Sequence, residues 1–392
     1  MAQSKEEQLW QASTDGNLAL VQELASDQSV DVNWGDAEVG RSPFYRACYY
    51  GHTEVVKYLM GLPSVDVCQK QNEGATPFCC ATSRGKIDVV ALLMDDQRVD
   101  INEGWKDGAT PFFQACQNDH KEIIAMMLTD RRLDPNAPNS HQETPFFISC
   151  VSGHLGVVTM LMASPVVDVL RARDDGCTPF FFSCYKAHID IVALLLSDPR
   201  VDINQPWSDN GTPLWSITQN GHLPVAQLVM AWGRDLDTQR KSAFNGKTAA
   251  EQGRLMATVD KDVDESEEDY KRVITYGPAI GDLIDEYEQD PVAVRQRLRR
   301  TAGVREYFIA NFFALLVFFS DHFLRLSSSI HPDTERFFKI CTQLPLEVQM
   351  VLCNRMYGSA RDVVFSRFSE KGFLWLSRAS TWAEVSTQEI PN

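Results

Sequence analysis

Histidine moves protons and binds metals near neutral pH, so the eight histidines are the first candidates for chemistry. Five of them recur at one position of a 34-residue period: His52, His120, His154, His188 and His222. A position that follows a repeat predicts a structural role, in which the imidazole hydrogen-bonds to the backbone between repeats. His141 falls in a predicted turn, and His322 and His331 have no carboxylate or cysteine at matching spacing.

Four of the ten cysteines also share one repeat position: Cys48, Cys116, Cys150 and Cys184. Neighbouring packed helices lie about 8–10 Å apart, and a disulfide spans at most about 7 Å between α-carbons. We therefore predict buried free thiols and a reducing, intracellular location, cytoplasmic with the nucleus also open. Cys79 and Cys80 lack partners at metal-binding spacing, so we expect no zinc site.

The motifs of common enzyme families are missing from the sequence. It has no glycine-rich phosphate loop, no Gly-x-Ser-x-Gly and no His-Glu-x-x-His. Cys353, Asn354 and Arg355 group polar atoms, but we interpret them as alternation between core and surface. We predict a protein that is not an enzyme and has no cofactor and no metal.

A Ser-Pro or Thr-Pro pair returns every 34 residues. The six prolines of these pairs are Pro43, Pro77, Pro111, Pro145, Pro179 and Pro213. The hydroxyl can cap a helix, and proline suits the first helical position because its missing N–H has no partner there. A large apolar residue follows each proline, and a second helix with an apolar stripe, such as Val89, Val90 and Leu93, completes the unit. A fixed period of this size indicates a solenoid.

These units resemble the ankyrin repeat. Its Thr-Pro-Leu-His-x-Ala appears as Thr-Pro-Phe-Phe-x-Ala, its Gly-His as Gly153-His154 and its Asp-Val-Asn as Asp202-Ile203-Asn204, over about residues 5–255. The period is one residue longer than the usual 33, and we place the extra residue in the loop after the second helix. The motif histidine is replaced, so we expect aromatic stacking at these positions instead: Tyr45, Cys79, Phe113, Phe147, Phe181 and Trp215.

We predict an all-α fold in which an ankyrin-type solenoid precedes a C-terminal helical bundle. The solenoid covers 1–255, with a degenerate N-terminal cap, six full repeats and a closing half-repeat; the bundle covers 276–380 and a flexible tail 381–392. The acidic residues within 256–275 predict a solvated linker, although a docking tail for a basic partner is the alternative. A further helix is expected to begin at Pro278. The apolar residues 307–319 predict a core helix, because a membrane span needs about twenty residues.

The net charge of −16 argues against nucleic acid as a partner, because phosphate binding needs clustered Lys and Arg. A basic protein or peptide with apolar anchors is the expected partner. Residues 1–23 are polar and acidic, so we expect no signal peptide, and no membrane association is predicted.

The resemblance implies a concave groove formed by the turns before Thr-Pro and by the ends of the first helices. The candidate partner-binding residues in the turns are Glu73, Asp107, Glu143, Asp174, Asp175 and Asp209. Those at the helix ends are Tyr49, Tyr50, Arg84, Gln117, Asn118, Tyr185, Lys186, Gln219 and Asn220. Tyrosines suit an interface, but Tyr49 and Tyr185 could equally only pack against neighbouring repeats. Exposed members of a nearby aromatic set would add an apolar strip: Trp105, Phe147, Phe181, Phe182 and Trp207.

The leading hypothesis is therefore a non-catalytic adaptor that holds a peptide with an apolar stripe and Lys or Arg flanks. In an alternative, the C-terminal bundle carries an unrecognised enzymatic or small-ligand site and the repeats target it. A third option is a purely structural solenoid within an assembly.

Overall fold

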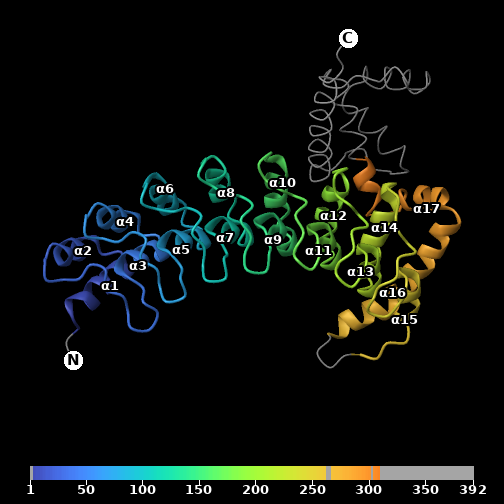
Figure 1. Cartoon of the computed structure of the whole chain (residues 1–392), viewed down its shortest axis with the longest axis horizontal. Helices are drawn as coiled ribbons and strands as arrows, with labels where there is room; N and C mark the ends of the chain where they lie inside the picture. Colours follow the sequence, from blue (N-terminus) through green and yellow to red (C-terminus); the bar gives the residue numbers. More distant parts are fainter. Residues whose placement is uncertain (1–2, 262–265, 302, 310–392) are drawn as a thin grey trace, which may run out of the picture. The chain divides into compact units, whose positions relative to one another are not determined.

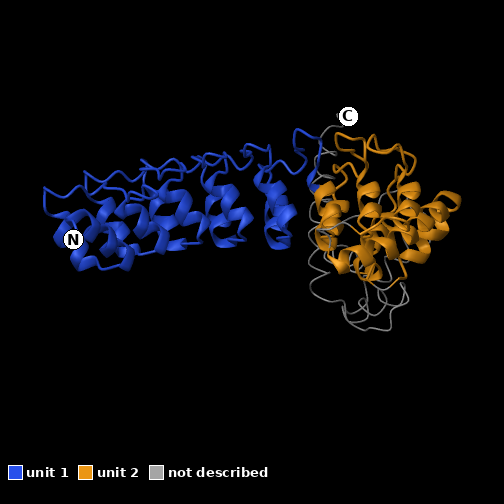
Figure 2. Cartoon of the chain, turned by 90° about the horizontal axis from the view of Figure 1, so that it is seen from below, with its two compact units in different colours: residues 1–179 blue, residues 180–392 orange. Residues whose placement is uncertain are grey.

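The computed structural model describes residues 3–261, 266–301 and 303–309. These residues form helices and connecting turns without a strand, which confirms the all-α prediction. The chain divides into two compact units, residues 1–179 and 180–392 (Figure 2). The predicted apolar core helix beyond residue 309, most of the predicted bundle and the tail lie outside the described residues.

Paired helices make up the first unit. They are α1 (Lys5–Asp15), α2 (Leu18–Ala25), α3 (Pro43–Tyr50), α4 (Thr53–Met60), α5 (Pro77–Ser83), α6 (Ile87–Asp95), α7 (Pro111–Gln117), α8 (Lys121–Met127), α9 (Pro145–Ser152) and α10 (Leu155–Ala163). The odd-numbered helices lie side by side in an inner row, and the even-numbered helices form an outer row (Figure 1).

The second unit continues the pairs and adds longer elements. Its helices are α11 (Pro179–Tyr185), α12 (Ile189–Leu196), α13 (Pro213–Gln219), α14 (Leu223–Trp232), α15 (Ala249–Met256), α16 (Glu267–Gln289) and α17 (Pro291–Leu298). The boundary between the units falls at the start of α11, whereas the predicted domain boundary lies near residue 255.

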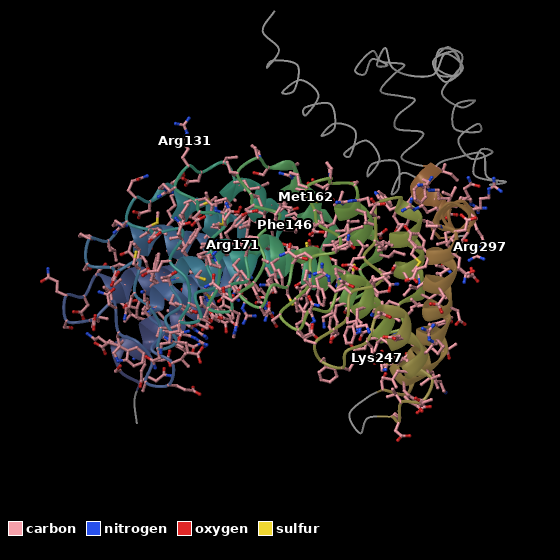
Figure 3. The ribbon with its side chains drawn as sticks, turned by 45° about the vertical axis from the view of Figure 1, so that its right-hand side comes forward. Arg131, Phe146, Met162, Arg171, Lys247 and Arg297 are labelled. Atoms are coloured by element: carbon pink, nitrogen blue, oxygen red, sulfur yellow. The ribbon has the colours of Figure 1, made fainter. Side chains whose placement is uncertain are left out.

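The Thr-Pro pairs begin the inner helices, as their chemistry predicts. The Thr110 hydroxyl accepts a hydrogen bond from the Phe113 amide at 3.2 Å, and Pro111 occupies the first turn of α7. The phenylalanine after each proline is fully buried in the first unit, as at Phe112 and Phe146. In Figure 3, Phe146 lies within the ribbon while Arg131 projects from it. Truncating such a phenylalanine to alanine typically costs about 3–5 kcal/mol.

The repeated histidines join successive inner helices. Their Nε2 atoms donate to main-chain carbonyls in the preceding repeat, from His52 to Thr14 at 2.8 Å, His120 to Ser83 at 3.0 Å, His154 to Gln117 at 2.8 Å and His222 to Tyr185 at 2.9 Å. This confirms the structural role predicted from their spacing.

The residues that replace the motif histidine are buried at every repeat. Phe181 has an aromatic neighbour outside this set, Trp207, whose ring is tilted and lies with its centroid 6.0 Å away. The four cysteines of the shared position are also buried and carry free thiols, as predicted. Burial raises the pKa of the Cys116 and Cys184 thiols, so both remain protonated near neutral pH.

A helix begins earlier in the second unit than the sequence suggested. We expected a linker up to residue 275 and a helix from Pro278, but α16 starts at Glu267 and continues through Pro278, so both of these expectations were wrong. The Ser266 hydroxyl caps it by accepting from the Asp269 amide at 3.0 Å. Acidic residues in its first turn also stabilise the N-terminal end of the helix dipole.

Close packing against α15 occurs beside the proline within α16. Gly277 and Gly281 face α15, where a Cβ added at Gly253 would lie 2.5 Å from the Gly277 carbonyl oxygen. The two helices therefore approach at backbone distance, and α16 also contacts α13 and α14. The next helix, α17, begins after Asp290, whose carboxylate accepts from the Ala293 amide at 2.9 Å.

Candidate functional site

The turns that precede the inner helices form a continuous row in the first unit. The Lys106 amide donates to the Glu73 carbonyl at 3.4 Å, and the Ser140 amide donates to the Asp107 carbonyl at 2.6 Å. The carboxylates of Glu73 and Asp107 remain exposed to solvent. The main chain of each turn is thus fixed by its neighbour while two predicted side chains stay accessible.

The remaining predicted turn carboxylates of this unit differ from one another. Arg173 pairs with Glu143 at 3.1 Å and with Asp175 at 3.0 Å, so both carboxylates are partly buried within the repeats. Asp174 is exposed. The negative charge available to a partner at this turn therefore comes mainly from Asp174.

Three predicted helix-end residues come together between α3 and α5. The ring centroids of Tyr49 and Tyr50 are 4.9 Å apart, and the Arg84 guanidinium carbon lies 4.4 Å from the Tyr49 centroid. Tyr49 is half-buried by these contacts, whereas Tyr50 is 43% exposed and Arg84 is exposed. Tyr49 thus packs against the neighbouring repeat, and Tyr50 faces solvent.

Sequence reasoning missed Arg46, which lies beneath these side chains and is only 8% exposed. Its Nε donates to the Thr14 hydroxyl at 3.0 Å and its Nη2 to the Tyr50 hydroxyl at 3.2 Å. Its guanidinium carbon is 4.3 Å from the Trp10 ring centroid. The sequence does mark Arg46 as unusual, because the other repeats have an uncharged residue at the same position: Cys80, Gln114, Ile148, Phe182 and Ser216.

The next inner helix ends with two exposed predicted residues, Gln117 and Asn118. The Gln117 carbonyl accepts the hydrogen bond of His154. The Asn118 side chain donates to the Gln114 carbonyl at 2.8 Å. The Gln117 side chain itself stays in solvent.

In the second unit, Tyr185 is 40% exposed and the Lys186 ammonium lies 5.2 Å from its ring centroid. Gln219 is half-buried, and so is Asn220, whose carbonyl accepts from Arg272 of α16 at 3.0 Å. The Asp209 carboxylate accepts from the Gly211 amide at 2.7 Å and from the Ser242 hydroxyl at 3.1 Å. Tyr185 and Lys186 are thus the most accessible predicted residues of this unit.

Stacked helix pairs, hydroxyl-capped Pro turns and histidines that bridge repeats describe one known architecture. Family models for ankyrin repeats match the chain, one for three copies over residues 9–104 and 97–171 and one for a single repeat over 175–207. The chain belongs to the ankyrin repeat family. Ankyrin repeats form protein–protein interaction modules, and the family is typically non-enzymatic. Among curated proteins, none matches the chain.

None of the five aromatic residues expected near the groove is fully exposed. Phe147 and Phe181 are buried, while Trp105, Phe182 and Trp207 are half-buried. The three half-buried rings therefore expose only part of their apolar surface, instead of the continuous strip that full exposure would give.

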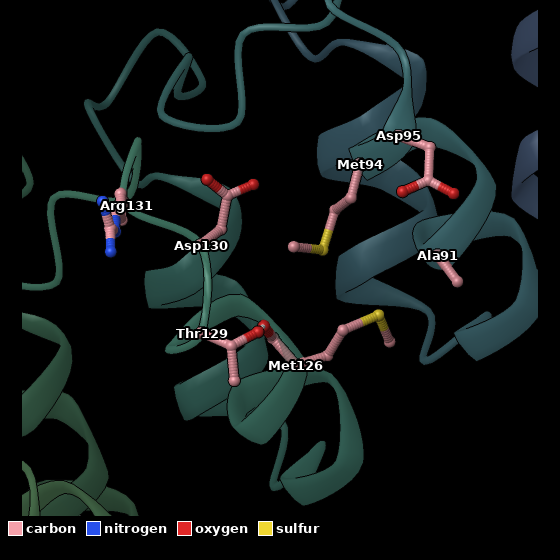
Figure 4. A pocket seen from close by; sticks show the side chains of 7 residues that line it. All are labelled: Ala91, Met94, Asp95, Met126, Thr129, Asp130 and Arg131. Atoms are coloured by element: carbon pink, nitrogen blue, oxygen red, sulfur yellow. Dashed lines mark hydrogen bonds between the residues drawn. The ribbon is translucent and has the colours of Figure 1, made fainter.

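A hollow of about 590 Å³ lies on the other side of the ankyrin stack, between α6 and α8 (Figure 4). It is lined by Ala91, Met94, Asp95, Met126, Thr129, Asp130 and Arg131. Figure 4 shows the side chains of Met94 and Met126 directed into the space between the helices. Asp130 pairs with Arg132 at 2.6 Å, and this contact lowers the pKa of its carboxyl. A carboxylate held ionised in this way suits a structural role better than proton transfer.

Two properties of the described residues bear on cofactors and membranes. Within 3–261, 266–301 and 303–309, no group of three or more His, Cys, Asp or Glu side chains is placed to hold a metal ion. Over the same residues, no helix combines the length and apolar character that crossing a bilayer requires.

Proposed function

We propose that this chain is a non-catalytic scaffold or adaptor that binds a partner protein or peptide along the inner-helix and turn face of its ankyrin repeats. We call the part of this face that belongs to the first unit the inner face. It is defined by Tyr50, Glu73, Arg84, Asp107, Gln117 and Asn118, all of them exposed. In the second unit, Tyr185 and Lys186 occupy the corresponding repeat positions.

The observation that supports this proposal most is that the main chain and the side chains of the same residues have different roles. The carbonyls of Glu73, Asp107 and Gln117 hold the next repeat through hydrogen bonds, while their side chains stay in solvent. Side chains presented on a fixed main chain lose little backbone freedom when a partner binds, so more of the contact energy appears as affinity.

The expected partner is basic with apolar anchors. Glu73, Asp107 and Asp174 offer exposed carboxylates, and the chain carries a net charge of −16. Tyr50 supplies an exposed aromatic surface, and aromatic side chains contribute strongly at interfaces. Binding through exposed charges weakens as salt rises, because the Debye length falls to about 3 Å at 1 M.

Affinity capture with matched variants tests the proposal. The double variant Gln117→Arg/Asn118→Arg adds two bulky cations to the inner face. The control Gln97→Arg/Thr129→Arg adds the same charge at exposed positions outside that face. We expect proteins captured by the unaltered full chain to be lost with the first variant and kept with the control. An identical captured set for both variants would exclude the inner face as the principal binding site.

The alternative, an enzymatic or small-ligand site in the C-terminal bundle, concerns mainly residues 310–380. These lie outside the described residues, so this alternative stays a prediction.

A further inference from the structure

Three arginines converge on one aromatic ring at the N-terminal part of the inner face. The guanidinium carbons of Arg41 and Arg46 each lie 5.8 Å from the Tyr49 ring centroid, and that of Arg84 lies 4.4 Å from it. They come from the turn before α3, from α3 itself and from α5. The cluster therefore arises from the packing of successive repeats.

These arginines have no acidic partner. Among the residues that the structure describes, no carboxylate oxygen lies within 4.0 Å of the side-chain nitrogens of Arg41, Arg46 or Arg84. Other arginines of the repeats pair closely, as Arg98 does with Asp96 at 2.6 Å. Acidic residues outnumber basic residues in the chain, 53 to 37. Three arginines around one ring without an acidic partner are therefore unexpected.

The cluster also keeps unused hydrogen-bond donors. A guanidinium has five N–H donors in a planar fork. The Nε of Arg41 is buried without a hydrogen-bond partner, and Arg46 donates to Thr14 and Tyr50 from its Nε and Nη2. Cation–π contacts of about 0.5–1 kcal/mol each at exposed sites hold the arginines near Tyr49 but use no N–H donor.

A carboxylate matches this arrangement. Its two oxygens accept the paired donors of an arginine fork, and the resulting charge-assisted bonds are stronger than neutral ones. The Tyr50 hydroxyl lies beside Arg46 on the exposed side of the cluster. An incoming anion would relieve the mutual repulsion of the three cations.

The neighbouring charges restrict the kind of molecule that carries the carboxylate. Glu38 and Glu73 are exposed in the turns before α3 and α5, and Asp107 follows in the next turn. A nucleic acid needs an extended basic surface, and these carboxylates would repel it. A peptide can match both sets of charges. One or two of its acidic residues would lie at the arginines, and its basic residues would lie at the neighbouring carboxylates.

We propose that Arg41, Arg46 and Arg84 form a carboxylate-binding site that receives an aspartate or glutamate side chain of the partner segment. The proposal rests on the function proposed above for the location of the partner on the inner face. It adds that a partner with basic flanks also carries an acidic anchor.

Labelled synthetic peptides and the full chain provide the test. Three peptides share the same lysine flanks and differ only at the centre, which is Glu-Glu, Gln-Gln or a single phosphoserine. We expect the Glu-Glu peptide to bind about tenfold more tightly than the Gln-Gln peptide at low salt, as for one or two charge-assisted hydrogen bonds. Arg41→Gln and Arg84→Gln should each reduce this preference. Arg131→Gln removes the same charge at an exposed position of the outer side and should leave it unchanged (Figure 3).

Each other outcome counts against the site. Equal binding of the Glu-Glu and Gln-Gln peptides, a preference that survives both arginine substitutions, or no binding of either peptide overturns the proposal. A phosphoserine peptide that binds while the Glu-Glu peptide does not overturns the assignment to carboxylates. If both peptides bind equally and Gln117→Arg/Asn118→Arg abolishes their binding, the carboxylate site fails and the proposed function stands. Circular dichroism of each variant verifies that its helices are intact.

Discussion

Asn102 binds the main chain on both sides of Leu133 in the following repeat, and Asp134 is one of its two partners. The Asn102 side-chain oxygen accepts from the Asp134 amide at 2.8 Å, and its nitrogen donates to the Arg132 carbonyl at 2.7 Å. The same pair of bonds is made by Asn33, Asn136 and Asn204 with the loops that follow them. In each of these four repeats, one side chain therefore satisfies two backbone groups of its neighbour.

The first prediction concerns the strength of this link. Asn102→Ala removes both bonds, and we expect the free energy of unfolding to fall by about 1 kcal/mol, because water can replace part of what is lost at an exposed site. Urea denaturation of the full chain, followed by circular dichroism, measures the change. Gln97→Ala, at an exposed position close by, is the control and should have little effect. Equal effects of the two substitutions would mean that the Asn102 bonds contribute nothing specific.

Cys68 provides a second prediction because it occupies the repeat position held by Asn102 one period later. Its Sγ donates to the Arg98 carbonyl at 3.1 Å, which is a weak bond. Cys68→Asn can donate to the same carbonyl and accept from the Asp100 amide, so we expect a gain of about 0.5–1.5 kcal/mol in the free energy of unfolding. Cys68→Ser, which has a single hydroxyl, is the control and should gain less. An asparagine variant no more stable than the serine variant contradicts this account.

The packing of α15 against α16 supports a third prediction. A Cβ at Gly253 would lie 2.5 Å from the Gly277 carbonyl oxygen and 3.0 Å from the Gly281 Cα, so the helices must separate. We expect Gly253→Ala to lower the free energy of unfolding by about 1–3 kcal/mol despite the better helix propensity of alanine. Thermal and urea unfolding of the full chain report the effect.

Gly156 in α10 is the matched helical control. A Cβ there would meet only the flexible end of the Lys121 side chain, and the residue is exposed. Gly156→Ala should therefore be neutral or stabilise the protein by up to about 1 kcal/mol. If both alanine substitutions stabilise, α15 and α16 do not pack at backbone distance.

These cases show which features a sequence reveals. The Thr110-Pro111 cap and the His120 bond depend on local chemistry and on a fixed spacing, so both were predictable. The helical character of residues 267–277 was not, because an acidic segment resembles a linker until the contact of Gly277 with α15 is known. Arg46 was missed for a similar reason. Its burial depends partly on Trp10 of α1, which only the stacking of repeats brings to it, whereas Tyr50 lies one turn along the same helix.

The last prediction concerns pH and His222. Burial lowers the pKa of its imidazole and Arg272 lowers it further, while the hydrogen bond to the Tyr185 carbonyl and the Asp269 carboxylate act in the opposite direction. The unfolded chain, with an ordinary histidine pKa of about 6.5, therefore binds the proton more readily than the folded chain does. Stability from His222 is then fully present above pH about 6.5 and is lost as the pH falls through the folded pKa.

The His222→Gln variant isolates this effect from the other titrating groups. We expect the free energy of unfolding of the unaltered chain to decrease between pH 7.5 and pH 5 by more than that of the variant, at no more than about 1.4 kcal/mol per pH unit for a single proton. Urea denaturation at a series of pH values gives both curves. Parallel curves would show that His222 has the same pKa in the folded and unfolded chains. A steeper decline in the variant would reverse the sign and show that the folded state favours the protonated ring.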